Sequence, residues 1–194
     1  MATEITKLSS VNRGALVSTE RTARAGGKFL TFFLAGEEYG IAILKVHEII
    51  GMMPITSVPR TPVHVRGVIN LRGKVIPIID LRLKFGMPGQ TQTSETCIIV
   101  VTVHGIEIGI VVDRVSEVLN ISGADIEDAP SFGAEVITDY ILGIGKSQGK
   151  VKILLDIDRV LSDQELNTLA SSAAESEPIP LTDTHKGDQN EVVL

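Results

Sequence analysis

An internal repeat divides most of the 194-residue chain into two similar halves. The segment GEEYGIAILKVHEI at residues 36–49 aligns with GIEIGIVVDRVSEV at residues 105–118, and residues 67–81 align with residues 143–157. Each half contains about 60 residues, which is enough for one small domain. The repeat therefore predicts two small domains of similar structure.

Positions that carry the same residue in both halves indicate what each domain needs in order to fold. Gly73 and Gly149 both follow a turn between two apolar runs, where a residue with positive φ is required. Asp80 and Asp156 both stand at the end of the second run, where a carboxylate accepts hydrogen bonds from backbone N–H groups. We expect these four residues to have matching structural roles in the two domains.

Arg72 is the exception at the same turn. It interrupts the apolar stretch VINLRGKVIPIIDL, residues 68–81, and its counterpart in the second half is Gln148. A charge at a turn costs little, because turns are exposed to solvent. Since the second half has no charge at this position, we interpret Arg72 as a residue that binds a partner; a solvated turn residue is the alternative.

Short apolar runs separated by turn residues predict a mostly β protein. The runs are FLTFFLAG, EEYGIAI, RGVINL, KVIPIIDL, TCIIVVTV, IEIGIVV and KVKILLDI. They predict two β-barrels packed together, the first at about 28–88 and the second at about 92–160. Pro77 inside one run predicts an edge strand or a bulge there. A capping box, Ser162-x-x-Glu165, predicts a C-terminal helix at about 163–170.

Both ends of the chain have the composition of flexible segments. Residues 1–27 mix Ser, Thr, Arg, Gly and Ala without a period, which predicts a flexible N-terminal arm. Residues 171–194 are polar and acidic, which predicts a disordered acidic tail. The folded unit is therefore expected at 28–170.

Composition and charge exclude several classes of protein. The net charge is −6, aromatic residues make up 4% and Trp is absent, so the chain lacks the basic and stacking surfaces of nucleic-acid binders. The single Cys97 excludes an intrachain disulfide and indicates a reducing compartment. The longest apolar run, 97–101, is far shorter than the roughly 20 residues of a membrane-spanning helix. We expect no signal peptide and no direct membrane insertion.

The sequence has no pattern typical of an enzyme, a metal site or a cofactor site. The four His residues lack metal-ligand spacing, and the nucleophile motif G-x-S-x-G is missing. The tripeptide Gly145-Lys146-Ser147 ends like a phosphate-binding loop, but the first Gly of that motif would fall on Tyr140. We therefore expect no enzyme activity, no metal and no cofactor.

Three segments carry a resemblance to a known family. EEYGIAILKVHEII, RGVINLRGKVIPIIDLRLKFG and GIVVDRVSEVL resemble the CheW family of chemotaxis coupling proteins, and the resemblance covers nearly all of 28–170. It implies two five-stranded SH3-like barrels with a hydrophobic groove between them. It also implies a non-enzymatic adaptor that links methyl-accepting chemotaxis receptors to the regulatory domain of the histidine kinase CheA. Such an adaptor is cytoplasmic and is recruited to membrane-associated receptor arrays.

The same resemblance implies where a receptor binds. The expected receptor-binding residues are Val46, Glu48, Ile49, Gly67, Arg72, Gly109 and Val118. The kinase-binding surface is expected on the barrel ends, without assigned residues. Alternatives remain open: Val46 and Ile49 are also compatible with barrel core, and Glu48 with a structural carboxylate, because Glu117 matches it in the repeat. His47 departs from the family pattern, in which we expect Gln.

Two other functions are compatible with the sequence. One is a small-molecule-binding β-barrel. The other is a CheV-type adaptor, which joins such a module to a phospho-acceptor receiver domain; the chain is too short after the barrels to contain that domain.

Overall fold

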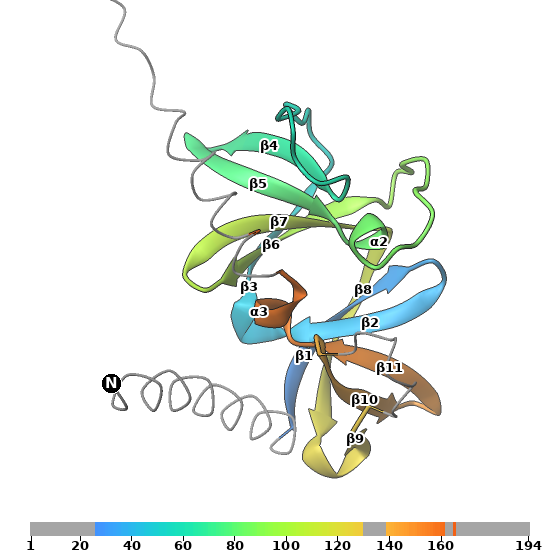
Figure 1. The fold of residues 1–194 in the computed structure, drawn as a ribbon. Helices are drawn as coiled ribbons and strands as arrows, with labels where there is room; N and C mark the ends of the chain where they lie inside the picture. Colours follow the sequence, from blue (N-terminus) through green and yellow to red (C-terminus); the bar gives the residue numbers. More distant parts are fainter. Residues whose placement is uncertain (1–25, 130–138, 162–164, 166–194) are drawn as a thin grey trace, which may run out of the picture.

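The computed structural model describes residues 26–129, 139–161 and 165, and these form two β-sheets, one above the other in Figure 1. The predicted acidic tail lies outside the described residues, and so does the predicted helix at 163–170 apart from Glu165. The predicted arm lies outside them up to residue 25. Gly26 and Gly27 belong to the first strand, so the folded unit begins slightly earlier than expected.

Eleven strands dominate the described part of the chain, which confirms a mostly β fold. In spatial order, the five-stranded sheet contains β3 (Val46–Gly51), β6 (Cys97–Val103), β7 (Ile106–Val112), β5 (Lys74–Asp80) and β4 (Val65–Leu71). The six-stranded sheet contains β8 (Arg114–Ser122), β1 (Gly26–Leu34), β2 (Glu37–Ala42), β11 (Lys150–Leu155), β10 (Ile141–Ser147) and β9 (Ile126–Glu127). Within the same ranges, four short helices connect the strands: η1 (Ile43–Lys45), α2 (Leu81–Lys84), η2 (Gly123–Asp125) and α3 (Ile157–Val160).

The two halves of the repeat exchange their first hairpins. Hairpin β1–β2 of the first half joins β8, β10 and β11 of the second, and hairpin β6–β7 of the second half joins β3, β4 and β5 of the first. The predicted boundaries of the two barrels, 28–88 and 92–160, are therefore wrong, because each sheet contains strands from both segments. Each sheet does contain one copy of every repeated strand. The physical reason is that the remaining strands of the two similar halves offer similar sheet edges for a hairpin to pair with. The local sequence of the hairpin does not select between these two edges.

The parallel ladders mark where each exchanged hairpin enters its sheet. β2 pairs with β11 and β7 pairs with β5, both in parallel. Strand β5 therefore lies inside its sheet, and the edge position predicted from Pro77 is wrong. The proline is tolerated because the ladder with β7 begins one residue later, at Ile78. A register shift does occur in the β4–β5 pair, between Val65 and Gly67 of β4.

A large apolar core joins the sheets, and each sheet has a smaller cluster of its own. The large core takes buried residues from both sheets, including Phe32 and Ile41 from one and Ile99 and Ile110 from the other. The five-stranded sheet has a second cluster of Ile69, Ile76, Ile78, Ile98, Val100 and Val111. The six-stranded sheet has Phe29, Leu119, Ile121 and Leu154. The smaller clusters fill the two SH3-like units, and the large core fixes one unit to the other.

The structural roles predicted from the repeat are confirmed. Gly73 and Gly149 have φ values of 88° and 71° in the β4–β5 and β10–β11 turns. Asp80 accepts hydrogen bonds from the N–H groups of residues 82 and 83 at the start of α2, and Asp156 accepts one from residue 158 at the start of α3. Each aspartate thus caps a short helix that ends a repeat.

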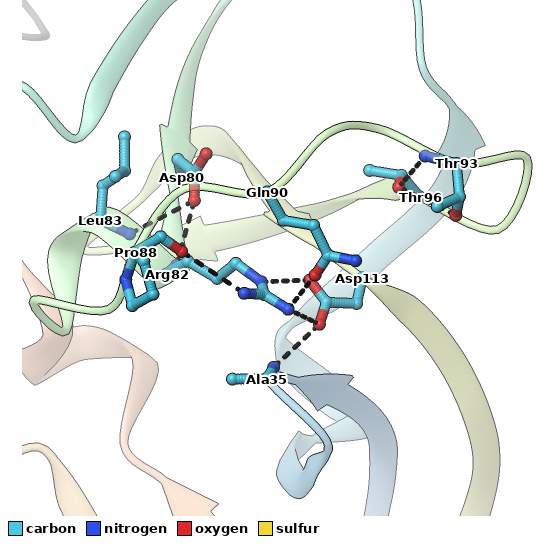
Figure 2. A network of polar contacts seen from close by, with 9 residues as sticks. All are labelled: Ala35, Asp80, Arg82, Leu83, Pro88, Gln90, Thr93, Thr96 and Asp113. Carbon is cyan, nitrogen blue, oxygen red and sulfur yellow. Dashed lines mark hydrogen bonds and ion pairs between the residues drawn. The ribbon is translucent and has the colours of Figure 1, made fainter.

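A network around Arg82 connects α2 with segments from both sheets (Figure 2). Its guanidinium binds the carboxylate of Asp113, between β7 and β8, and the side-chain oxygen of Gln90. Asp113 also accepts a hydrogen bond of 2.8 Å from the N–H of Ala35, in the β1–β2 turn. Hydrogen bonds to Asp113 raise the pKa of Arg82 further above its ordinary value, against the opposing effect of burial. The network ties the exchanged hairpin β1–β2 to the other sheet.

Candidate functional site

An ion pair bridges the two edges of the five-stranded sheet. Arg72, in the β4–β5 turn, donates from Nη1 to Glu48 Oε1 at 2.9 Å and from Nη2 to Glu48 Oε2 at 2.8 Å. Glu48 lies on edge strand β3, and β4 forms the opposite edge. The bidentate contact therefore joins edges that have no backbone ladder between them.

The local sequence holds Arg72 in a fixed position. Arg72 has a φ of 54° and Gly73 a φ of 88°, the two positive values of a tight hairpin turn. The side chain of Asn70 accepts a hydrogen bond of 2.8 Å from the Gly73 N–H. On β3, a register shift lies between Val46 and Glu48, and bulges of this kind change the direction of neighbouring side chains. Both charged groups are thus placed by backbone features.

A surface hollow of about 260 Å³, here called the rim pocket, lies beside this ion pair. It is lined by His47, Glu48, Leu71, Arg72, Lys74, Ile76, Val100 and Glu107. The buried Ile76 and Val100 supply apolar floor, because they also belong to the small core of this sheet. The pocket can therefore accept an apolar side chain beneath a charged rim.

A second ion pair and a histidine complete the rim. Lys74 Nζ lies 3.2 Å from both carboxylate oxygens of Glu107. His47 Nε2 lies 2.5 Å from the hydroxyl of Thr102, and its Nδ1 lies 3.9 Å from Glu107. The rim thus combines three basic side chains with two carboxylates, an arrangement that sets orientation and specificity in protein binding.

The structure brings together two of the seven predicted receptor-binding residues, Glu48 and Arg72. Val46 is half-buried and packs against the large core. Ile49 is 46% exposed on β3, and its side chain points away from the face of Glu48, because side chains alternate along a strand. Val118 is 49% exposed on β8 of the other sheet, where it is the repeat counterpart of Ile49.

The two predicted glycines lie where the backbone packs closely. A Cβ on Gly67, whose φ is 132°, would stand 2.0 Å from the carbonyl oxygen of Thr56. A Cβ on Gly109 would stand 2.5 Å from Ile78 and 2.7 Å from Ile98, in the small core of the five-stranded sheet. Both glycines thus have structural reasons to be glycine, and their receptor-binding role stays a prediction.

Sequence reasoning missed most of the pocket. The residues it did not assign are His47, Leu71, Lys74, Ile76, Val100 and Glu107. A signal existed for Lys74 and Ile76, which follow Arg72 at the alternate positions that share one face of a strand. The repeat was misleading for Glu107. Because Glu107 matches Glu38, the repeat indicated a role in folding, whereas the structure places Glu107 at the rim pocket.

The described residues show neither a candidate metal site nor a candidate membrane span. Within 26–129, 139–161 and 165, no three or more His, Cys, Asp and Glu side chains are placed to hold a metal ion. The helices in the same ranges are too short or too polar to cross a bilayer.

The fold and the rim pocket together define the class of this protein. Its members have two SH3-like units that exchange hairpins and a charged surface pocket suited to binding another macromolecule. A family model described as "CheW-like domain" matches residues 28–165. The chain belongs to the CheW-like domain family, as the sequence resemblance predicted.

Similar sequences from several bacteria support this family assignment. The chain is 42% identical over 162 residues to the chemotaxis protein CheW of Klebsiella aerogenes, covering 84% of this chain and 97% of that protein. It is 35% identical to CheW of Bacillus subtilis, over 73% and 90% of the two chains. It also matches the chemotaxis protein CheV3 of Helicobacter pylori at 32% identity, but over 46% of that longer protein.

A solved structure has the same fold. The crystal structure described as the scaffolding protein TtCheW from Thermoanaerobacter tengcongensis superposes with a TM-score of 0.66 at 36% identity, covering 72% of this chain and 95% of that chain. The predicted fold class of two packed SH3-like units is confirmed. The family assignment makes the chain an adaptor or scaffold of chemotaxis signalling.

Proposed function

We propose that this chain couples methyl-accepting chemotaxis receptors to the histidine kinase CheA. It acts without catalysis, from the cytoplasm, after recruitment to membrane-associated receptor arrays. The observation that carries the proposal is the ion pair between Arg72 and Glu48 at the rim pocket. The second half of the repeat folds with Gln148 in place of Arg72, so the arginine is better explained by binding than by folding.

The geometry of the pocket fits a helical partner. Receptor tips are helical hairpins, and a helix gains about 25 cal/mol for each Å² of apolar surface that it buries, before the costs of association. Leu71 offers apolar contact within the pocket, and Arg72 at its rim fixes the register of the helix. The kinase binds elsewhere, at the barrel ends, because an adaptor holds both partners at once.

Arg72→Gln separates binding from folding. Arg72 is 75% exposed, so the substitution is expected to lower the free energy of unfolding by less than about 1 kcal/mol. Its guanidinium has five N–H donors and gives two to Glu48. Loss of a charged hydrogen bond to the receptor is expected to weaken receptor binding about tenfold. The measurements are a denaturant melt and co-sedimentation with receptor-containing membranes and CheA.

Gln148→Arg in the Arg72→Gln background is the matched control. It restores the charge at the equivalent turn of the other sheet, and receptor binding is expected to stay weak. If Arg72→Gln is stable and couples receptor to kinase like the parent, the rim pocket is not the receptor site.

Ile49→Asp tests whether the outer face of β3 contributes to receptor binding, and the equivalent face of β8 serves as the comparison. Ile49 and Val118 are repeat counterparts and are exposed to 46% and 49%, so Val118→Asp is a matched control for the cost of a new surface charge. The side chain of Ile49 points away from the rim pocket, but it lies on the same edge strand as Glu48. If the receptor also covers the outer face of this strand, Ile49→Asp is expected to weaken receptor binding more than Val118→Asp does. Receptor titrations of the two variants provide the comparison. Equal losses in two folded variants would contradict a receptor site confined to the five-stranded sheet.

A further inference from the structure

The basic side chains of the rim pocket are its most exposed charged groups. Arg72 and Lys74 are 75% and 70% exposed and His47 is 51% exposed, whereas Glu48 and Glu107 are 28% and 29% exposed. The carboxylates lie deeper and hold the basic groups in place. A partner that approaches the pocket therefore meets positive charge first, although the whole chain carries a net charge of −6.

His47 lies beside the two ion pairs of the rim. Arg72 pairs with Glu48, and Lys74 pairs with Glu107. The groups facing His47 are the hydroxyl of Thr102 on β6, the carboxylate of Glu107 on β7 and, through Glu107, the ammonium of Lys74 on β5. His47 thus adds a basic ring beside the two ion pairs at the exposed side of the rim.

The equivalent surface of the six-stranded sheet lacks this arrangement. Ser116 and Gln148 replace His47 and Arg72. Lys152 replaces Ile76 and is buried against Glu38. Of the three basic positions, only the counterpart of Lys74 keeps its charge, as Lys150.

We infer that the rim pocket binds a carboxylate-bearing segment of its protein partner. An Asp or Glu side chain of the partner contacts the exposed Lys74 and Arg72 at the rim. Charges at such a rim contribute to association rate and specificity, and salt screens them. This inference rests on the proposed function, since it takes the partner to be the receptor hairpin.

Lys74→Met and Lys150→Met form a matched pair for the test. Both lysines occupy the same repeat position after a hairpin turn, one at the rim pocket and one on the other sheet. The probe is the soluble cytoplasmic fragment of a methyl-accepting chemotaxis receptor, either unchanged or with the Asp and Glu residues of its hairpin tip replaced by Asn and Gln. Affinity for the full chain is measured by titration calorimetry at several salt concentrations.

Lys74→Met is expected to weaken binding of the unchanged fragment about fivefold and to reduce its salt dependence. Lys150→Met is expected to bind like the parent. With the neutralised fragment, the parent and Lys74→Met are expected to bind alike. If both lysine variants match the parent, or if Lys74→Met weakens the neutralised fragment equally, the inference is overturned while the proposed function stands. If the parent binds neither fragment, both are overturned.

Discussion

Gly67→Ala is expected to lower the free energy of unfolding by about 3–5 kcal/mol. The new Cβ would stand 2.0 Å from the carbonyl oxygen of Thr56, at a backbone φ of 132° that side chains rarely adopt. That carbonyl accepts a hydrogen bond of 2.9 Å from Val68, and the Thr56 N–H donates another of 2.9 Å to the Val68 carbonyl. The substitution therefore adds backbone strain and also breaks a bridge between β4 and the preceding loop.

Gly73→Ala is the matched control for Gly67→Ala. Gly73 has a φ of 88°, but a Cβ there would meet no atom within 4 Å. It is expected to lose only about 1–2 kcal/mol, the cost of the left-handed conformation alone. Urea melts of both variants measure the difference. A Gly67→Ala protein as stable as Gly73→Ala, yet deficient in receptor binding, would instead favour the direct binding role predicted for Gly67.

Lys152→Met is expected to cost about 3–5 kcal/mol of the free energy of unfolding, because it leaves a partly buried carboxylate without its cation. Lys152 is 2% exposed, and its Nζ lies 2.7 Å from Glu38 Oε2, whose side chain is 10% exposed. The double variant Lys152→Met/Glu38→Leu removes both charges and is expected to recover most of that loss. Chemical denaturation of the two single variants and the double variant gives the coupling energy directly.

Lys74→Met breaks the equivalent but exposed ion pair and so serves as the control for Lys152→Met. Glu107 is the repeat equivalent of Glu38, but its partner Lys74 is 70% exposed, so breaking that pair is expected to cost less than about 1 kcal/mol. Similar losses from Lys152→Met and Lys74→Met would contradict the argument from burial.

The coupling between Lys152 and Glu38 should also depend on pH. Burial alone would raise the pKa of Glu38, but hydrogen bonds from Lys152 and Thr31 and the positive charge of Lys152 outweigh it. The pKa of Glu38 therefore lies below its ordinary value of 4.5 in the folded protein. A carboxyl group whose pKa is lower in the folded than in the unfolded protein stabilises the fold. This stabilisation is fully present at pH values above its pKa in the unfolded protein, and it is lost as the pH falls through its pKa in the folded protein. The coupling energy is expected to hold at pH 7 and to shrink below about pH 4.5.

Local features of this protein could be read from its sequence. The turn glycines Gly73 and Gly149 and the helix-capping Asp80 and Asp156 have the conformations and contacts expected from the repeat. These features depend on a few neighbouring residues, so the repeat shows them twice. The contrast between Arg72 and Gln148 likewise identified one residue of the candidate site from the repeat alone.

The burial of Lys152 was not visible in the sequence. In the run KVKILLDI, Lys150 and Lys152 alternate with apolar residues and resemble the solvent side of a half-exposed strand. In the structure Lys152 lies inside the six-stranded unit, because Glu38 arrives from the exchanged hairpin to neutralise it. A residue more than 100 positions away in the chain thus decides which side of the strand is the interior.

By itself, the sequence determined most of the strands, the turns, the caps and the duplication, because each of these depends on residues close together in the chain. Strands β3, β8, β9 and β10 were not among the predicted apolar runs. Only the tertiary structure decided the exchange of hairpins and the composition of the rim pocket. The pocket draws side chains from β3, β4, β5, β6, β7 and the β4–β5 turn. Pairing between distant strands depends on the fit of whole sheets, and two similar halves offer nearly equal local choices. Packing of the complete chain therefore selects the arrangement that brings Glu48 to Arg72.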